Sequence, residues 1–144
     1  MSTEQNKAMV RRVFEEGINA NNPSVFDEVI GASYVNHDMP APAPGPEGLK
    51  QVNGAFTAAF PDMRVVIEDV VAEGDRVVSR GEMTGTHRGA FMGLPATGKQ
   101  IRVGYIDVWR VADGKLVENW VKLDMLGMMQ QLGAVPGPGQ AAPA

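Results

Sequence analysis

The sequence contains no cysteine among its 144 residues. This absence excludes disulfide bonds, thiolate nucleophiles and metal sites with sulfur ligands. The chain has two histidines, and neither forms a ligand pattern such as His-Glu-x-x-His with the scattered carboxylates. We therefore expect no metal site.

Long hydrophobic runs and basic clusters are also missing. No apolar segment is long enough to span a membrane, and the polar residues 1–7 lack the apolar core of a secretion signal. The net charge is -4, and only Arg11 and Arg12 are adjacent basic residues. Nucleic-acid binders usually carry a basic stripe. We expect a cytoplasmic protein that binds neither nucleic acid nor membranes.

What is present is the composition of an ordinary globular domain, with 44% hydrophobic and 21% charged residues. Residues 1–134 are predicted to form one domain. The Pro/Gly/Ala-rich residues 135–144 have too little apolar content to pack and are predicted to be a disordered tail.

The first half of the chain has the spacing of helices. Ser2 and Gln5 form a predicted capping box, and the helix that follows ends near residues 21–22. A second helix is predicted to start with Asn22 as N-cap and Pro23 in its first turn, and to end at Gly31 in a left-handed conformation. A third helix begins at about Glu47.

After residue 61 the apolar period changes from helical to alternating. Four strands and a short final helix are predicted, with a hairpin turn at Asp113-Gly114. Helices that precede a run of antiparallel strands indicate an α+β fold, with the helices packed on the concave face of a curved sheet. The predicted strands are Met63–Ala72, Arg76–Thr84, Ile101–Val111 and Leu116–Leu123, and the final helix spans residues 124–132 and is closed by Gly133.

A set of motifs occurs in order along the chain and resembles the SnoaL-like polyketide cyclases, or ester cyclases, of the nuclear transport factor 2-like superfamily. The resemblance covers nearly the whole chain except the tail, and it implies a cone-shaped barrel of curved antiparallel sheet around one apolar pocket. The motifs are Tyr34-Val35-Asn36-His37-Asp38, Phe60-Pro61-Asp62, the loop residues 85–89 and 93–99, Ile106-Asp107-Val108-Trp109-Arg110-Val111, residues 113–120, and residues 123–133.

The resemblance implies a cofactor-free intramolecular aldol reaction, in which a pocket base forms an enolate that closes a ring. Characterised cyclases use an aspartate of the last strand as acid/base, and this role carries over to Asp124. The assisting histidine of the family has no clear counterpart, because His37 and His87 lie outside the last two strands. The superfamily also implies a homodimer that packs convex face to convex face.

From the residues alone, Asp124 has two interpretations. Strand alternation places it on one face with Trp120 and Lys122, and burial there would raise its pKa and make it a stronger base. Alternatively, Asp124 is the N-cap of the closing helix. Lys122 could pair with Asp124, bind an enolate oxygen, form a Schiff base, or extend to the mouth of the cone; we favour the last.

Asp107 shares a face with Tyr105 and Trp109. A two-residue hairpin turn would pair Asp107 with Trp120, whereas a three-residue loop with a bulge would pair Ile106 with Trp120. A shift of one residue exchanges the two faces. We interpret Asp107 as a convex-face or interface residue.

The predicted site combines two candidate catalytic groups with a mostly apolar wall. A histidine side chain could donate a hydrogen bond to a substrate carbonyl, so His37 joins Asp124 as a candidate catalytic residue. The candidate substrate-binding residues are Tyr34, Asn36, Phe56, Phe60, Met83, His87, Tyr105, Trp120 and Lys122.

Two other functions remain open. The chain could be a non-catalytic protein that binds a hydrophobic small molecule. It could also be a related pocket enzyme, such as an isomerase, a dehydratase, or an epoxide hydrolase built on Asp107, Arg80 and Asp124. We favour an enzyme of the cyclase type, acting as a lyase or isomerase, with an apolar small molecule as its substrate.

Overall fold

The computed structural model describes residues 2–137 and 139. Helix α1 (Thr3–Arg12) starts with the predicted capping box, in which Ser2 and Gln5 exchange hydrogen bonds between side chain and backbone amide. A wider π-helical segment, η1 (Val13–Asn19), continues it directly. The apolar stripe of both segments, including Val10, Val13 and Phe14, is buried.

The second helix ends differently from the prediction. Helix α2 (Ser24–Val29) has Pro23 at its N-cap position and no side-chain cap, so Asn22 is not the N-cap. The chain then enters strand β1 (Ile30–Asn36) without a turn, and Gly31 lies inside this strand rather than in a left-handed cap. A Cβ on Gly31 would approach Val117 Cγ1 to 3.0 Å, so the glycine serves close packing of β1 on its neighbour.

Helix α3 (Gly45–Ala59) follows the proline-rich residues 37–44 and ends just before Phe60 and Pro61. Strands β2 (Arg64–Glu73), β3 (Arg76–Thr86), β4 (Gln100–Ala112) and β5 (Lys115–Leu123) then form in sequence order. The four predicted strands are confirmed with shifts of one or two residues at their ends. Helix α4 (Met125–Gln131) follows, and Gly133 has the predicted positive φ of 79°.

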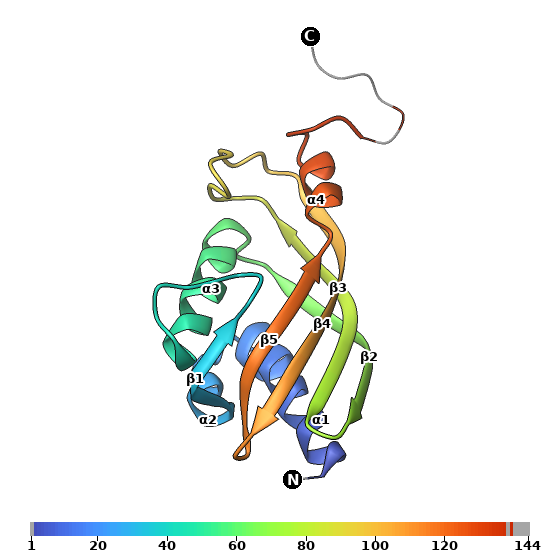
Figure 1. Cartoon of the computed structure of the whole chain (residues 1–144). Coiled ribbons are helices and arrows are strands. Elements are labelled where there is room, and N and C mark those ends of the chain that lie inside the picture. Colours follow the sequence, from blue (N-terminus) through green and yellow to red (C-terminus); the bar gives the residue numbers. More distant parts are fainter. Residues whose placement is uncertain (1, 138, 140–144) are drawn as a thin grey trace.

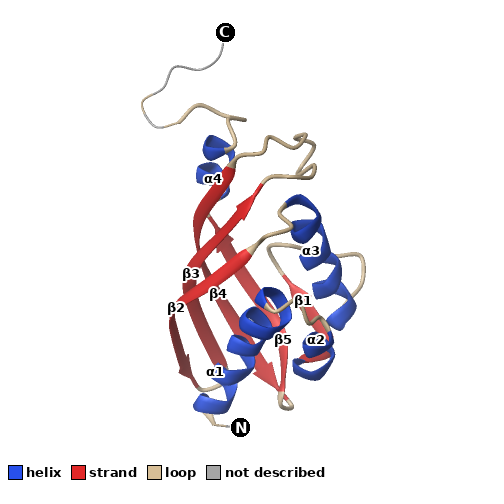
Figure 2. Ribbon diagram, turned by 180° about the vertical axis from the view of Figure 1, so that it is seen from behind, coloured by secondary structure: helices blue, strands red, loops and turns tan. Residues whose placement is uncertain are grey.

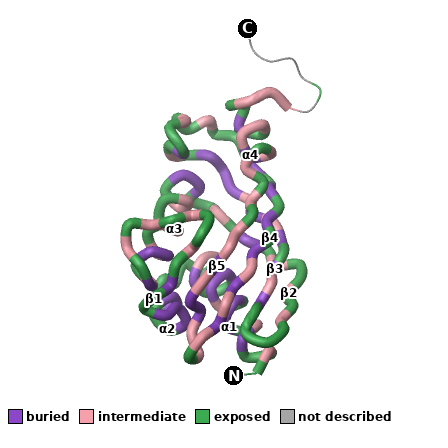
Figure 3. Tube along the Cα trace, in the orientation of Figure 1, coloured by how far each residue is buried: buried purple, intermediate pink, exposed green. Residues whose placement is uncertain are grey.

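The sheet order is β1-β5-β4-β3-β2, and β1 runs parallel to β5 whereas the other neighbours are antiparallel. The predicted α+β class is confirmed. The resemblance implied a cone-shaped barrel of antiparallel strands, and the sheet is open and contains one parallel pair, β1 with β5. Helices α1 and α3 cover one face, called the inner face below, and α4 lies at one end of the sheet (Figures 1 and 2). Along β3 and β4, buried residues alternate with more exposed ones (Figure 3).

A β-bulge in β5 decides which side chains reach the inner face. The hairpin has the predicted two-residue turn, because Ala112 pairs with Lys115 and Val111 with Leu116. The register then shifts by one residue, so that Trp109 pairs with Asn119 and Asp107 with Val121. Neither predicted register occurs, since Trp120 pairs with Val108. A bulge adds one unpaired residue and reverses the alternation beyond it.

The opposite, outer face of the sheet carries exposed apolar side chains. Val66, Val71 and Ile106 are each about half exposed, at 49%, 59% and 50%. A convex-face homodimer would cover such side chains, and it stays a prediction. No helix among the described residues is long and apolar enough to cross a membrane. Most of the tail predicted to be disordered (138 and 140–144) lies outside the described residues.

Candidate functional site

A cavity of about 110 Å³ lies between the inner face of the sheet, η1 and α3. We call it the inner pocket. Its wall is almost entirely apolar, with a few polar side chains placed among the apolar ones. The wall consists of Val13, Phe14, Ile18, Asn36, Met39, Leu49, Val52, Asn53, Phe56, Met63, Val65, Met83, Tyr105, Asp107, Trp109, Asn119, Val121 and Leu123.

Asp107 is the carboxylate of this wall. Its residue is only 2% exposed, and burial raises the pKa of its carboxyl to about 7, since a charged form loses hydration there. The Ser79 hydroxyl donates a hydrogen bond to Asp107 Oδ1. This hydrogen bond and the Trp109 indole lower the pKa of Asp107 and so offset part of the increase caused by burial. Asp107 therefore changes its charge near neutral pH.

Strand register explains why Asp107 reaches the pocket. Tyr105, Asp107 and Trp109 alternate along β4 and are all buried, whereas Ile106 between them is exposed. Ser79 lies opposite Asp107 on β3. The interpretation of Asp107 as a convex-face or interface residue is therefore wrong.

Further polar groups line the pocket together with Asp107. Asn36 Nδ2 donates to Asn119 Oδ1 at 3.2 Å, and Asn119 Nδ2 donates to the Val108 carbonyl at 3.0 Å. The Tyr105 hydroxyl lies 3.4 Å from Ser79 Oγ. Sequence reasoning missed Ser79 and Asn119, because a buried serine or asparagine in a strand gives no signal of its own.

Asp124 lies elsewhere. Its side chain is exposed, lies outside the residues that line the inner pocket, and accepts a hydrogen bond from the Gly127 amide at 2.9 Å as N-cap of α4. The expectation of a pocket position is therefore wrong, and the helix-cap interpretation is confirmed. The bulge in β5 is the reason. Beyond it, the residues that face inward are Asn119, Val121 and Leu123, and not the predicted group of Trp120, Lys122 and Asp124.

Trp120, Lys122 and His37 also lie outside the inner pocket. Lys122 Nζ is 2.9 Å from Asp38 Oδ1, and its side chain is 83% exposed, so it neither pairs with Asp124 nor reaches the inner pocket. His37 stacks on Trp120 with ring centroids 4.8 Å apart, and its Nε2 lies 2.9 Å from Glu118 Oε2. These three predicted site residues belong to a surface cluster.

The remaining predicted wall residues divide into two groups. Asn36, Phe56, Met83 and Tyr105 line the inner pocket as predicted. Phe60 and His87 are fully buried against each other, with ring centroids 5.5 Å apart, and line none of the cavities described here. His87 Nδ1 instead accepts the Thr97 amide at 3.2 Å. Tyr34 lines a neighbouring cavity.

Comparison with known proteins agrees with this architecture. The family model for SnoaL-like polyketide cyclases matches residues 8–132. The chain belongs to this family. No curated protein sequence gives a significant match.

Three solved structures illustrate the similarity to other members of the SnoaL-like fold. TsrD from Streptomyces laurentii shares 28% identity at a TM-score of 0.84, covering 94% of this chain and 99% of TsrD. A candidate SnoaL-like polyketide cyclase from Jannaschia sp. CCS1 shares 30% identity at a TM-score of 0.81, with coverage of 93% and 95%. IdmH, a candidate polyketide cyclase from Streptomyces antibioticus, shares 32% identity at 0.76, with coverage of 90% and 99%.

Within this SnoaL-like chain, the arrangement considered for an epoxide hydrolase does not form. Arg80 lies on the outer face, where its guanidinium pairs with Asp69 and Glu68. Asp107 and Asp124 are also separated by position, one inside the pocket and one exposed. The described residues contain no group of three or more potential metal-ligating side chains.

Proposed function

We propose that this protein is an enzyme of the polyketide cyclase type that closes a ring through an enolate, with Asp107 as its acid/base. The observation that carries the proposal is a desolvated carboxylate in an apolar pocket. Desolvation brings the pKa of Asp107 to about 7, and a general base is most effective when its pKa lies near the operating pH.

The reaction needs one proton to leave and return. The ionised Asp107 removes a proton from a carbon next to a carbonyl, and the C–H electron pair forms the enolate. The enolate carbon attacks a second carbonyl carbon of the same molecule, which forms a C–C bond and leaves an alkoxide. The protonated Asp107 then returns its proton to the alkoxide, so the residue ends as it began.

Hydrogen-bond donors near Asp107 support this chemistry. The buried Trp109 indole N–H lowers the pKa of Asp107, and its Nε1 forms no hydrogen bond of ordinary length and angle with the described residues. The Asn36 and Asn119 amides and the Tyr105 hydroxyl belong to residues of the same wall. Donors fixed in a dry pocket stabilise a developing enolate oxygen more strongly than donors in water do.

The test compares two aspartates with the same substitution. The assay follows deuterium exchange at the central carbon of an aromatic 1,3-diketone by NMR, which measures enolisation without the natural substrate. Asp107→Asn is expected to lower the enzyme-dependent rate by about 10²- to 10⁴-fold. Asp124→Asn, the matched control, keeps a helix-capping side chain and is expected to retain the wild-type rate.

The pH profile gives a second readout. Because Asp107 must be ionised to act as base, the wild-type rate is expected to rise with pH, reach half its maximum near pH 7 and level off above it. Exchange by Asp107→Asn at the wild-type rate would overturn the assignment. Binding of the diketone without any exchange would favour the non-catalytic binding protein.

A further inference from the structure

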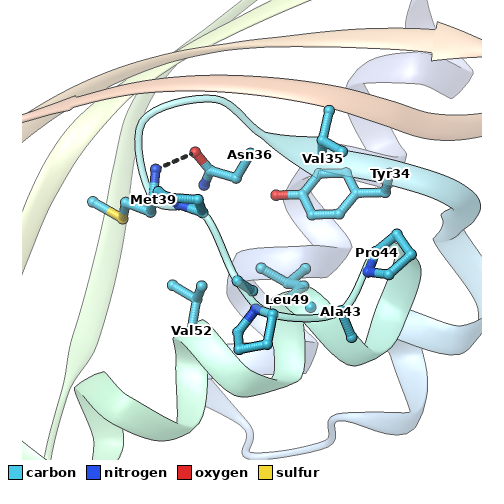
Figure 4. A pocket seen from close by; sticks show the side chains of 12 residues that line it. Tyr34, Val35, Asn36, Met39, Ala43, Pro44, Leu49 and Val52 are labelled. Atoms are coloured by element: carbon cyan, nitrogen blue, oxygen red, sulfur yellow. Dashed lines mark hydrogen bonds between the residues drawn. The ribbon is translucent and has the colours of Figure 1, made fainter.

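A second cavity, of about 270 Å³, lies beside the inner pocket (Figure 4). We call it the loop pocket. Its walls come from the end of β1, the proline-rich residues 39–44 and the first half of α3. Apart from Tyr34 and Asn36, the side chains around it are apolar. The loop pocket is therefore a second apolar space with very few polar groups.

The loop that encloses this pocket is fixed at both ends. Asn36 Oδ1 accepts the backbone amides of Asp38 and Met39 at 3.0 and 2.9 Å. Gln51 Oε1 accepts the Ala43 amide at 3.2 Å. A Cβ on Gly48 would collide with the Ala43 carbonyl oxygen, so the glycine allows the loop to lie directly on α3. The pocket is thus formed before any ligand binds.

The Tyr34 hydroxyl is the unusual group in the loop pocket. Tyr34 is 2% exposed, and its hydroxyl has no hydrogen-bond partner among the described residues. Figure 4 shows the oxygen directed towards the space bounded by Asn36, Met39 and Leu49. The Asn36 amide is already bonded to Asn119. A buried hydroxyl without a partner costs free energy, and a ligand atom that accepts its proton would remove this cost.

The position of the ring is set by other contacts. Tyr34 stacks on Trp109 with ring centroids 6.1 Å apart. The ring therefore packs as part of the core, and only the hydroxyl lacks a contact with a described hydrogen-bond partner. Burial raises the pKa of Tyr34 and the nearby Asn36 side chain lowers it by less, so the hydroxyl stays protonated and able to donate.

The two cavities adjoin. Asn36, Met39, Leu49 and Val52 line both of them. The inner pocket, at about 110 Å³, is smaller than the usual small-molecule site of roughly 300–1,000 Å³, and is close to the size of an engineered cavity of ~150 Å³ that holds one benzene ring. A substrate larger than one ring therefore needs the neighbouring space.

We propose that the loop pocket is a second compartment of the ligand site, which takes a short carbonyl-bearing chain and binds its oxygen through the Tyr34 hydroxyl. The ring or reacting segment occupies the inner pocket beside Asp107. This inference rests on the proposed function only for the identity of the ligand in the inner pocket. The substrate class that follows is a molecule with a small apolar ring system and a ketone or ester side chain.

The experiment measures binding of two probes that differ in one oxygen, 4-phenylbutan-2-one and butylbenzene, by calorimetry. Tyr34→Phe keeps the ring and its stacking and removes the hydroxyl. We expect the Kd of the ketone to rise about 2- to 10-fold in the variant, as for loss of one hydrogen bond, while the Kd of butylbenzene changes by less than a factor of about 2.

Thr57→Val is the control, because it removes a hydroxyl from α3 that lines neither cavity and donates to the Gly54 carbonyl. It is expected to leave the Kd of the ketone unchanged. An equal ketone affinity in wild type and Tyr34→Phe, a ketone-specific loss in Thr57→Val, or no ketone binding by the wild type would each overturn the proposal.

The free protein provides a check on folding. Tyr34→Phe is expected to unfold at the wild-type temperature or above it, since no hydrogen bond is lost. The binding result is also independent of catalysis. Asp107→Asn is expected to lose enolisation and to keep the preference for the ketone, so a failure of the proposed acid/base role would leave the Tyr34 result standing.

Discussion

Alternate residues of β4 and β5 point to opposite faces of the sheet. Charged side chains are solvated on the outer face, whereas a carboxylate is buried on the inner face. On the outer face, Glu118 lies between His37 and Arg110, and the Lys122 side chain pairs with Asp38 while 83% exposed. On the inner face, Asp107 lies in an apolar wall and is 2% exposed. Water compensates the outer charges, whereas the inner carboxylate loses hydration and gains basicity.

Under the proposed function, the burial of Asp107 costs stability and supplies reactivity. Replacing a functional but poorly solvated group often stabilises a protein while it abolishes activity. The contrast between the faces can therefore be tested by removing charges from each and measuring stability together with function.

The largest effect on stability is expected for Asp107→Asn. The pKa of Asp107 is about 7 in the folded protein and about 3.9 in an unfolded chain. Between these values the native state holds a proton that the unfolded state has lost, so the wild type loses stability as the pH rises from 4 to 7. The loss is on the order of 4 kcal/mol.

The variant lacks this titration. Asp107→Asn is therefore expected to be more stable than the wild type at pH 8 and to approach it near pH 4, as measured by urea unfolding at a series of pH values. Other titrating groups contribute equally to the free energy of unfolding of both proteins, so their contributions cancel when the two free energies are subtracted. A difference that does not depend on pH would contradict a buried carboxyl at position 107.

A smaller effect is expected at Asp124, which lies at the end of the same sheet but in water. Asp124→Ala removes the hydrogen bond to the Gly127 amide and is expected to lower the free energy of unfolding by about 1 kcal/mol. Enolisation is expected to stay at the wild-type rate. Asp124→Ser, which can also cap a helix, should recover most of the stability. If Asp124→Ser kept the stability and lost enolisation, Asp124 would have a role in the reaction.

Local patterns were sufficient to predict most of the fold. The capping box at Ser2, the period change after Pro61 and the Asp113-Gly114 turn each act through nearby residues, and each occurs in the structure. Strand β1 was missed because its burial does not alternate and its partner β5 is about 80 residues away along the chain. A parallel edge strand has no local turn that would indicate it.

The candidate site was harder to predict, because it depends on a single extra residue. Alternation along β5 correctly grouped Trp120 with Lys122, but the bulge near Val117 determines which group faces inward. The family resemblance predicted an apolar pocket, and such a pocket forms, but Asp124, the residue to which it assigned the acid/base role, lies outside this pocket. The pKa of Asp107 follows from packing by β3, β4 and η1 together, which no local pattern contains.

The smallest effect is expected at Lys122. The Lys122 ammonium, together with the Val121 backbone amide, holds the pKa of the Asp38 carboxyl below its usual value. In Lys122→Gln the pKa of Asp38 should rise only part of the way, because the Val121 amide still donates to Asp38 Oδ2 at 2.8 Å. Carbon-detected NMR titration of the aspartate carboxyls measures this shift.

Stability and enolisation should both stay unchanged in Lys122→Gln, since exposed ion pairs contribute little. Lys7→Gln removes a charge of the same sign from α1, where Lys7 pairs with Glu4 at 2.7 Å, and it should leave the pKa of Asp38 unaltered. A shift in the Asp107 titration in Lys122→Gln would mean that charge on the outer face reaches the inner pocket. We expect no such shift, because the pKa of Asp107 is set by burial and by the uncharged side chains of Ser79 and Trp109.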